Sequence, residues 1–180
     1  VRNMKYVALL RGINVGKSVQ VPMKKLKILM EEIGCTNIVT YLNSGNVVFD
    51  SSDDKDKIRN ILEAKLKKVF GQYIPTLVKT SKEMMRIKNS IPDEWNNDET
   101  QQTYVAYLFK DVANPDLIKE LPIKHEYIDI RYVHEALIWN IKRENYNKSH
   151  ITKIANHPSY DRITTRNVNT ARKLAELSIE

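Results

Sequence analysis

The sequence predicts an α+β protein with two subdomains, and two observations lead to this prediction. Residues 1–81 hold segments in the order β-α-β-β-α-β, the split arrangement of ferredoxin-like domains. A related order, β-α-β-β-α, begins at residue 101 and ends in helices. We therefore expect a ferredoxin-like subdomain over 1–81, a helical linker with an acidic loop over 82–100, and a second α+β subdomain with C-terminal helices over 101–180.

The first subdomain begins with a strand, "KYVALLRG", and a helix, "VPMKKLKILMEEIGC", whose apolar residues recur at helical spacing. Pro22 suits the first turn of this helix, and Gly34 suits its end. Two strands, "NIVTYL" and "NVVFDS", then form a hairpin. Asn43, Ser44 and Gly45 between them tolerate the positive φ of a tight turn.

A second helix and a last strand complete this subdomain. Asp53 or Asp54 caps the helix, whose apolar residues keep helical spacing up to Gly71. The strand, "YIPTLVKT", contains Pro75, which cannot donate a ladder hydrogen bond, so we expect it at a sheet edge.

The second subdomain follows a helical linker, "SKEMMRIKNSI", and an acidic loop, "PDEWNNDE". It holds a strand, "TYVAYLF", a short helix, "NPDLIKEL", and a hairpin of "EYIDIRYV" and "ALIWNIKR" that turns near His134 and Glu135. Two helices follow, "SHITKIANH" and "TRNVNTARKLAELSI", with no obvious last strand.

The composition favours a cytoplasmic globular protein. Its 42% hydrophobic and 28% charged residues are ordinary for this class. Membrane helices need about 20 apolar residues, and no run here approaches that length. The stretch "VRNMKYVALL" also lacks a signal-peptide cleavage site. The single cysteine, Cys35, excludes an internal disulfide and fits a reducing compartment, and packing is favoured over a nucleophilic role for it.

The net charge of +7 is unevenly distributed. Residues 1–81 hold 14 Lys/Arg against 7 Asp/Glu, and residues 142–173 hold 8 against 2, whereas residues 83–135 hold 11 acidic and 6 basic residues. Two basic segments around an acidic middle could form a positive cleft that attracts an anion or nucleic acid. The alternative is a set of solvated helix faces.

The stretch "LLRGINVGKSV" has the composition of a phosphate-binding loop but not its spacing. That loop needs four residues between two glycines, directly before a Lys-Ser pair that opens a helix. Here Gly12 and Gly16 are one residue too close, and Pro22 delays the helix. The stretch is therefore interpreted as a turn after the first strand. The hydrogen-bond donors it offers are Arg11, Asn14 and Lys17.

Other known motifs are incomplete. The third strand, residues 46–49, lacks the paired aromatic side chains on which RNA-recognition modules stack bases. His134 begins like a zinc-protease helix, but Ile138 stands where the second histidine belongs. His150 and His157 have no ligand cluster near them in the sequence. We expect no metal and no cofactor.

The start of the terminal helix is a further candidate anion site. Thr164 or Thr165 can cap this helix, whose N-terminus offers N–H groups and the positive end of the helix dipole. Arg166 and Asn167 in the first turn would add donors for a carboxylate or phosphate. The alternative is a plain helix cap with a solvated arginine.

Four stretches, "ALLRGINVG", "VPM", "TYLNSGNVVF" and "TTRNVNTARKLAEL", resemble in order and spacing the bacterial proteins grouped as domain of unknown function 1697. The resemblance spans nearly the whole chain and implies two α+β subdomains, the first ferredoxin-like. It implies no established activity. The chain departs from the family pattern at Val168, where tryptophan is usual, and at Lys17, where a second glycine is common.

The candidate site residues are polar donors at strand ends or at the expected helix start. Tyr6–Leu10 and Val47–Phe49 are apolar in both alternating sets, so we expect the second subdomain to cover one face of the first sheet. A site is then expected at the seam, with Arg11 and Arg166 as charge partners of an anionic small molecule or nucleic acid. The candidate ligand-binding residues are Arg11, Asn14, Lys17, Asn43, Ser44, Asn46, Thr165, Arg166 and Asn167.

Two alternatives stay open. The first is an enzyme that acts on a small phosphorylated metabolite. The motifs hold no histidine, cysteine or acidic residue placed as a base, so Tyr41 or a carboxylate brought in by folding would have to act. The second is a protein–protein interaction module that docks a partner through a sheet edge or the acidic loop over 93–99.

Overall fold

In the computed structural model, which describes residues 3–180, the chain forms two compact units. The first unit is the chain up to Met85 together with Leu174–Glu180, and the second is Arg86–Lys173. Each unit contains one four-stranded antiparallel sheet together with helices. The predicted α+β class is therefore confirmed.

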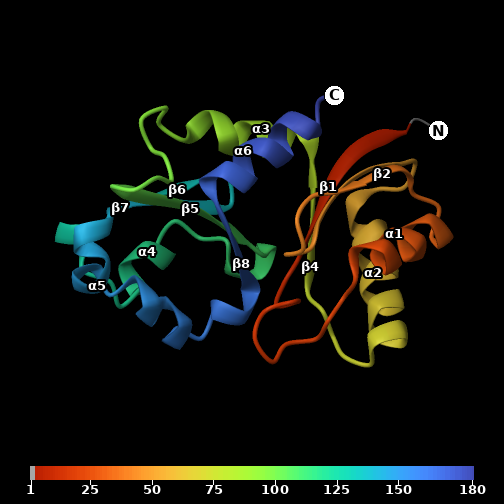
Figure 1. The fold of residues 1–180 in the computed structure, drawn as a ribbon, viewed down its shortest axis with the longest axis horizontal. Helices are drawn as coiled ribbons and strands as arrows, with labels where there is room; N and C mark the ends of the chain where they lie inside the picture. The colour runs from red at the N-terminus through yellow and green to blue at the C-terminus, as the bar shows by residue number, and fades with distance from the viewer. Residues whose placement is uncertain (1–2) are drawn as a thin grey trace. The chain divides into compact units, whose positions relative to one another are not determined.

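The first unit is built on a sheet in the order β2-β3-β1-β4. Figure 1 shows α1 and α2 on the same face of this sheet, where their apolar residues share one core with Tyr6 and Leu10 of β1. The strand that follows Pro75 lies at an edge, as predicted. The elements are β1 (Met4–Leu10), α1 (Met23–Glu32), β2 (Thr36–Thr40), β3 (Asn46–Ser51), α2 (Lys55–Phe70) and β4 (Thr76–Thr80).

The helix ends in this unit follow the predicted signals. The helix α1 begins directly after Pro22. Asp54 caps α2, since its side chain accepts a 2.8 Å hydrogen bond from the backbone N–H of Lys57. Gly71 ends α2 in the left-handed conformation, at a φ of 77°. The hairpin turn over 43–45 also lies where the sequence predicts it, between β2 and β3.

The chain passes from the first unit to the second within α3 (Ser81–Ser90). This helix has a reciprocal cap. The backbone N–H of Glu83 donates to Thr80 Oγ1, and the backbone N–H of Thr80 donates to Glu83 Oε1, at 3.1 and 2.9 Å. Two donors at the helix start are satisfied in this way.

The second unit is built on a sheet in the order β6-β7-β5-β8. Its strands are β5 (Gln101–Leu108), β6 (Asp129–Val133), β7 (Ala136–Lys142) and β8 (Ile163–Asn167). Its helices are α4 (Leu117–Glu120), α5 (Tyr146–Ser149) and most of α6 (Val168–Leu177). Five 3-10 turns connect them: η1 (Lys110–Val112), η2 (His125–Tyr127), η3 (Arg143–Asn145), η4 (Ile151–Asn156) and η5 (Tyr160–Arg162).

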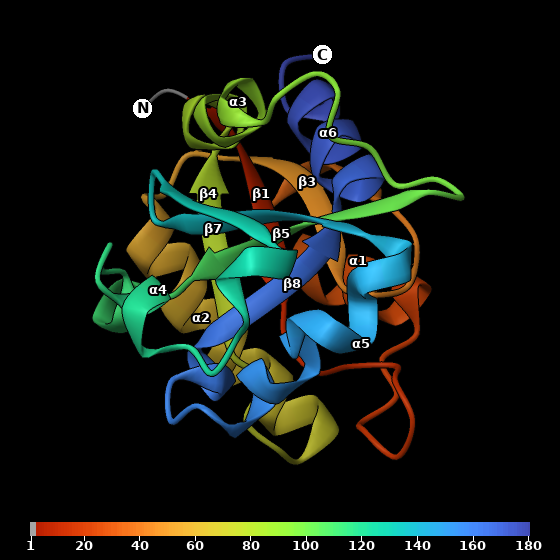
Figure 2. The same cartoon turned by 90° about the vertical axis from the view of Figure 1, so that its left-hand side faces the viewer.

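The fourth strand, β8, corrects the predicted β-α-β-β-α order of the second unit. Residues 163–167 were expected to lead into and open the terminal helix, but they pair antiparallel with β5, beside which Figure 2 shows them. The run Ile163-Thr164-Thr165 explains the strand, because three consecutive β-branched side chains favour extended backbone. The second sheet therefore repeats the strand order of the first.

In the described part of the chain, no helix combines the length and the apolar content needed to cross a bilayer.

Candidate functional site

Asn14 joins the loop after β1 to the β2–β3 turn. Its Nδ2 donates hydrogen bonds to the carbonyl oxygens of Val21 and Asn43, at 2.9 and 2.7 Å. Its Oδ1 accepts a 2.7 Å hydrogen bond from the backbone N–H of Val21. Both Nδ2 hydrogens are used within the protein, so Asn14 positions this loop, and its predicted contact with a ligand gains no support from the geometry.

Gly45 and Asn46 are also held by close packing. A Cβ on Gly45, whose φ is 89°, would lie 2.6 Å from Cβ of Leu10, so only glycine fits there. The side chain of Asn46 is fully buried, and its Nδ2 donates to the Tyr41 carbonyl and to Ser44 Oγ at 2.9 and 2.8 Å. The motif "NSGN" is therefore explained by the turn that it builds.

The remaining candidates of the first unit are more accessible. Lys17 and Asn43 are exposed, whereas Arg11 and Ser44 are half-buried. Lys17 lies in a turn closed by two hydrogen bonds between Val15 and Ser18, and α1 begins well after it. Lys17 therefore does not open a helix, which agrees with the argument against a phosphate-binding loop.

The structure changes the roles of Thr165, Arg166 and Asn167, the three candidate residues near the C-terminus. Neither Thr164 nor Thr165 caps α6. The helix begins at Val168, and Asn167 Oδ1 accepts a 3.0 Å hydrogen bond from the backbone N–H of Thr170. Thr165 and Arg166 are neighbours in β8, so their side chains point to opposite faces of the second sheet. They cannot line one pocket on a single face of that sheet.

Arg166 is buried, not solvated. Its Nη1 donates to Thr164 Oγ1 and to the Thr165 carbonyl, at 2.8 and 2.9 Å. Burial lowers the pKa of Arg166 to about 10, and burial also raises the pKa of the neighbouring Tyr107. The guanidinium is still charged at neutral pH and forms part of the interior.

The candidate residues divide between the two units. The first unit holds Arg11, Asn14, Lys17, Asn43, Ser44 and Asn46, and the second holds Thr165, Arg166 and Asn167. Their expected convergence at a seam stays a prediction.

A pocket of about 230 Å³ lies within the second unit, and we call it the aromatic pocket. Four of its nine lining residues are aromatic, and none is charged. The sheet, α5, η4 and η5 together supply the wall. The lining residues are Gln102, Tyr104, Trp139, Tyr146, Ile151, Thr152, Ile154, Tyr160 and Thr165.

One face of the second sheet forms the floor of the aromatic pocket. Tyr104 of β5 stands opposite Trp139 of β7, with ring centroids 6.1 Å apart and planes 19° from parallel. Gln102 lies two residues before Tyr104, and Thr165 stands opposite Ala106, two residues after it. By strand alternation all four side chains lie on one face.

Gln102 is the least expected member of this floor. Its side chain is only 8% exposed, yet within residues 3–180 its amide makes no hydrogen bond to the protein. Its amide atoms are not sealed from solvent, so they can bond to water or to a ligand in the aromatic pocket. The alternation of polar and aromatic residues in "QQTYVAYL" was the available sequence signal, but sequence reasoning missed the pocket.

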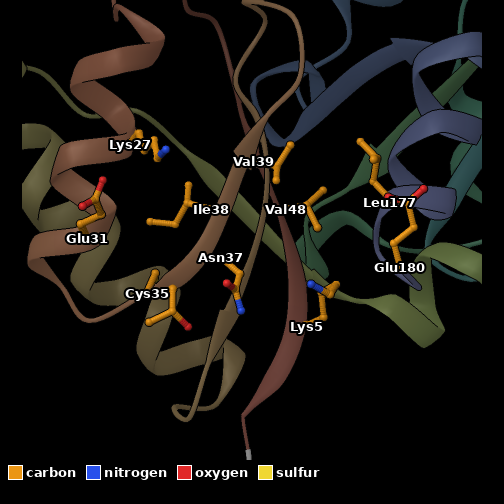
Figure 3. Close-up of a pocket in the computed structure, with 11 residues that line it drawn as sticks. Lys5, Lys27, Glu31, Cys35, Asn37, Ile38, Val39, Val48, Leu177 and Glu180 are labelled. Carbon is orange, nitrogen blue, oxygen red and sulfur yellow. The ribbon is translucent and has the colours of Figure 1, made fainter.

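The first unit has a larger depression, of about 740 Å³, around the edge strand β2. Figure 3 shows Ile38 and Val39 on opposite sides of this strand, with charged residues of both signs around them. Lys5 in its wall is already paired with Asp50 at 3.1 Å. Ligand sites are mostly apolar concavities with a few convergent polar groups, so this depression fits a ligand site less well than the aromatic pocket does.

Cys35 also lines that depression, but its thiol is not activated. Burial, and then the negative charge of Asp53, raise the pKa of the thiol to about 11. The thiol therefore stays protonated at neutral pH, which supports packing over nucleophilic chemistry.

No three His, Cys, Asp or Glu side chains of residues 3–180 gather as metal ligands would. His157 is occupied locally: its Nδ1 accepts from the backbone N–H of Ser159 at 3.0 Å, and its Nε2 lies 3.6 Å from Glu120 Oε1. These contacts describe a histidine that holds the segment between η4 and η5.

Residues 4–139 match the family described as a protein of unknown function, DUF1697. A conserved bacterial protein from Streptococcus pneumoniae has a similar solved structure, with a TM-score of 0.85 over 98% of this chain and 99% of that chain, at 22% sequence identity. At this identity the likeness shows the fold alone. The chain has no significant match among curated proteins. The family match covers three quarters of the sequence, and the chain therefore belongs to the DUF1697 family.

Proposed function

We propose that the protein binds an anionic ligand at the aromatic pocket of its second unit. The observation that carries this proposal is an uncharged, aromatic pocket whose wall is supplied largely by the basic segment 142–173. The pocket would hold the uncharged part of the ligand, and the lysines beside it would attract the anionic part.

The lysines of this segment are available for such a role. Lys142, Lys148 and Lys153 are exposed, and within the described residues none of them is paired with a carboxylate; Lys148 Nζ lies over the ring of Tyr127, 5.8 Å from its centroid. The arginines of the segment are engaged instead. Arg143 bonds to Asn97, Arg162 pairs with Asp111 and Arg172 bonds to Asn96.

Lys148 and Lys153 lie in the sequence beside residues that line the pocket. Lys148 follows Tyr146 by two residues, and Lys153 stands between Thr152 and Ile154. Two exposed acidic side chains lie at similar sequence distances, Glu144 two residues before Tyr146 and Asp161 next to Tyr160. The segment 142–173 as a whole holds 8 basic residues against these 2 acidic ones, which favours an anionic ligand.

The lining favours binding over acid–base catalysis. It holds no imidazole, thiol or carboxylate, the groups that most often move protons in active sites. Its hydroxyls and its one amide are suited to orienting a ligand.

The proposal is tested by fluorescence anisotropy with a labelled single-stranded DNA 12-mer and with inorganic tripolyphosphate as competitor. The variant Lys148→Glu/Lys153→Glu should weaken binding about tenfold, and affinity should fall steeply with salt. The control Lys24→Glu/Lys68→Glu changes two exposed lysines of the first unit by the same charge. An equal loss of affinity in both variants would show that binding depends on net charge alone and would contradict the proposal.

We also infer that the first unit belongs to the ferredoxin-like class. The β-α-β-β-α-β order and the sheet order β2-β3-β1-β4 with both helices on one face support this assignment. The buried single cysteine, Cys35, supports the expected location in the cytoplasm.

A further inference from the structure

The size of the aromatic pocket limits what part of a ligand it takes. Pockets that enclose a whole drug-sized ligand measure about 300–1,000 Å³. At about 230 Å³, this pocket holds one ring system, and the rest of the ligand must lie outside it.

The walls suit a flat ring. Tyr104 and Trp139 already stack on each other, and the rings of Tyr146 and Tyr160 remain 39% and 38% exposed. Aromatic rings that solvent can reach are the surfaces on which nucleobases stack in proteins. The two exposed tyrosines come from α5 and η5, so two separate segments present rings to one pocket.

The floor offers polar groups that can read the edge of such a ring. The amide of Gln102 can donate and accept at the same time, the pattern with which glutamine recognises a nucleobase edge. The hydroxyl of Thr165 and the indole N–H of Trp139 likewise make no hydrogen bond within residues 3–180. Three hydrogen-bonding side chains without protein partners therefore line one face.

From these observations we propose that the aromatic pocket binds a nucleobase, so that the ligand is a nucleotide, either free or within a single-stranded nucleic acid. The base stacks on the aromatic wall and bonds to Gln102, while its phosphate faces Lys148 and Lys153. This inference rests on the proposed function and names its ligand class.

The binding of a nucleobase is tested first, by the fluorescence of Trp139. Trp139 lines the pocket, whereas Trp95 is packed under Arg131, so the variant Trp95→Phe leaves Trp139 as the reporter. AMP, GMP, CMP and UMP are titrated separately, with ribose 5-phosphate as the ligand that lacks a base. We expect at least one mononucleotide to quench Trp139, and ribose 5-phosphate neither to quench it nor to compete.

The contacts are tested next. Gln102→Leu keeps the size of the side chain and removes its amide, and Tyr146→Ala removes one exposed ring. Each should raise the Kd of the quenching nucleotide about tenfold. The matched control is Tyr73→Ala, which removes a 54% exposed ring from the first unit and should leave the Kd unchanged. Melting curves check that each variant is folded.

The outcomes separate the two proposals. If ribose 5-phosphate binds as well as AMP and Gln102→Leu changes nothing, the nucleobase inference is wrong while anion binding stands. If uncharged adenosine binds as tightly as AMP with no salt dependence, the base site stands and anion binding is wrong. If no nucleotide binds, both fail. A labelled 12-mer of deoxyadenosine that binds more tightly than AMP assigns the base to nucleic acid, and the reverse order assigns it to a free nucleotide.

Discussion

The side-chain amide of Asn14 donates a 2.7 Å hydrogen bond to the backbone carbonyl of Asn43, across two segments that are far apart in the sequence. Asn14 itself has a φ of 57°, a conformation in which asparagine is better tolerated than most residues. The turn after β1 and the β2–β3 turn are thereby fixed to each other.

Replacement of Asn14 should destabilise the first unit. Asn14→Ala removes the partner of three backbone groups and places alanine in the left-handed region, so we expect a loss of about 2–4 kcal/mol in the free energy of unfolding. Urea unfolding measures this. Asn43→Ala is the control, because only the backbone of Asn43 takes part and its side chain is exposed. An equal loss in both variants would show that the bond is not the cause.

Gly45 and Gly71 provide a matched pair that separates crowding from backbone strain. Both have positive φ, but a Cβ on Gly45 would meet Leu10 at 2.6 Å, whereas a Cβ on Gly71 would have nothing within 4 Å. Gly71→Ala should lower the free energy of unfolding by about 1 kcal/mol, because of the left-handed conformation alone. Gly45→Ala should lower it clearly more, because the added Cβ also overpacks the contact with Leu10. Thermal melting compares the two, and similar melting temperatures would contradict the close contact.

Glu83 should contribute stability that depends on pH. Burial raises the pKa of this carboxyl, but the Thr80 backbone N–H and Lys55 lower it more, and the net shift is downward. The carboxylate therefore stabilises the folded state above the unfolded pKa of about 4.3, and this contribution is lost as the pH falls through the lower, folded value. Unfolding of the wild type and of Glu83→Gln is measured from pH 7 to pH 3. The difference between their free energies of unfolding should become smaller at acid pH. A difference that stays constant would show that the charge of Glu83 is not its cause.

The β6–β7 hairpin turns through two residues that are not glycine and both have positive φ, His134 at 46° and Glu135 at 62°. This geometry is the two-residue turn that prefers Asn-Gly. The variant His134→Asn/Glu135→Gly should therefore raise the free energy of unfolding by about 1 kcal/mol. The prediction fails if chemical denaturation finds the variant no more stable than the wild type.

Gln102 and Thr103 are neighbours on opposite faces of β5, and replacing each by an apolar residue should change the stability of the second unit differently. Thr103 Oγ1 donates to the Asn96 carbonyl and accepts from Asn140, so Thr103→Val should destabilise the second unit by about 1–3 kcal/mol. Gln102 has no such partner within the described residues, so Gln102→Leu should leave the ligand-free protein as stable as the wild type or more stable. A large loss of stability in Gln102→Leu would show that the amide serves the fold and not a ligand.

Local signals were sufficient to predict most of the first unit. Proline at the start of α1, the cap of α2 at Asp54 and the glycine after it each act within a few residues, so the sequence displays them directly. The strand β8 was missed because the prediction used local signals alone. Its β-branched residues favour a strand, but the Thr-Thr-Arg-Asn stretch also has the composition of a helix cap, and pairing with the distant strand β5 decides between the two.

The candidate site was predictable only in part. The motif residues Asn14 and Asn46 were recognised, but their hydrogen-bond partners lie in other turns, and these show that both side chains build the loops. Arg166 was expected as the charge partner of an anionic ligand, with a solvated arginine as the alternative, whereas its side chain is buried in the interior. The aromatic pocket is lined by residues of six elements of the second unit, so the pattern within β5 alone was not sufficient to indicate it.

The most direct test of a nucleobase in the aromatic pocket is the NMR signal of the Gln102 side-chain amide, which is assigned by its disappearance in Gln102→Leu. If the ligand bonds to this amide, addition of the nucleotide that quenches Trp139 should shift the signal in proportion to occupancy. A saturating nucleotide that shifts other resonances and leaves this one in place would contradict the account.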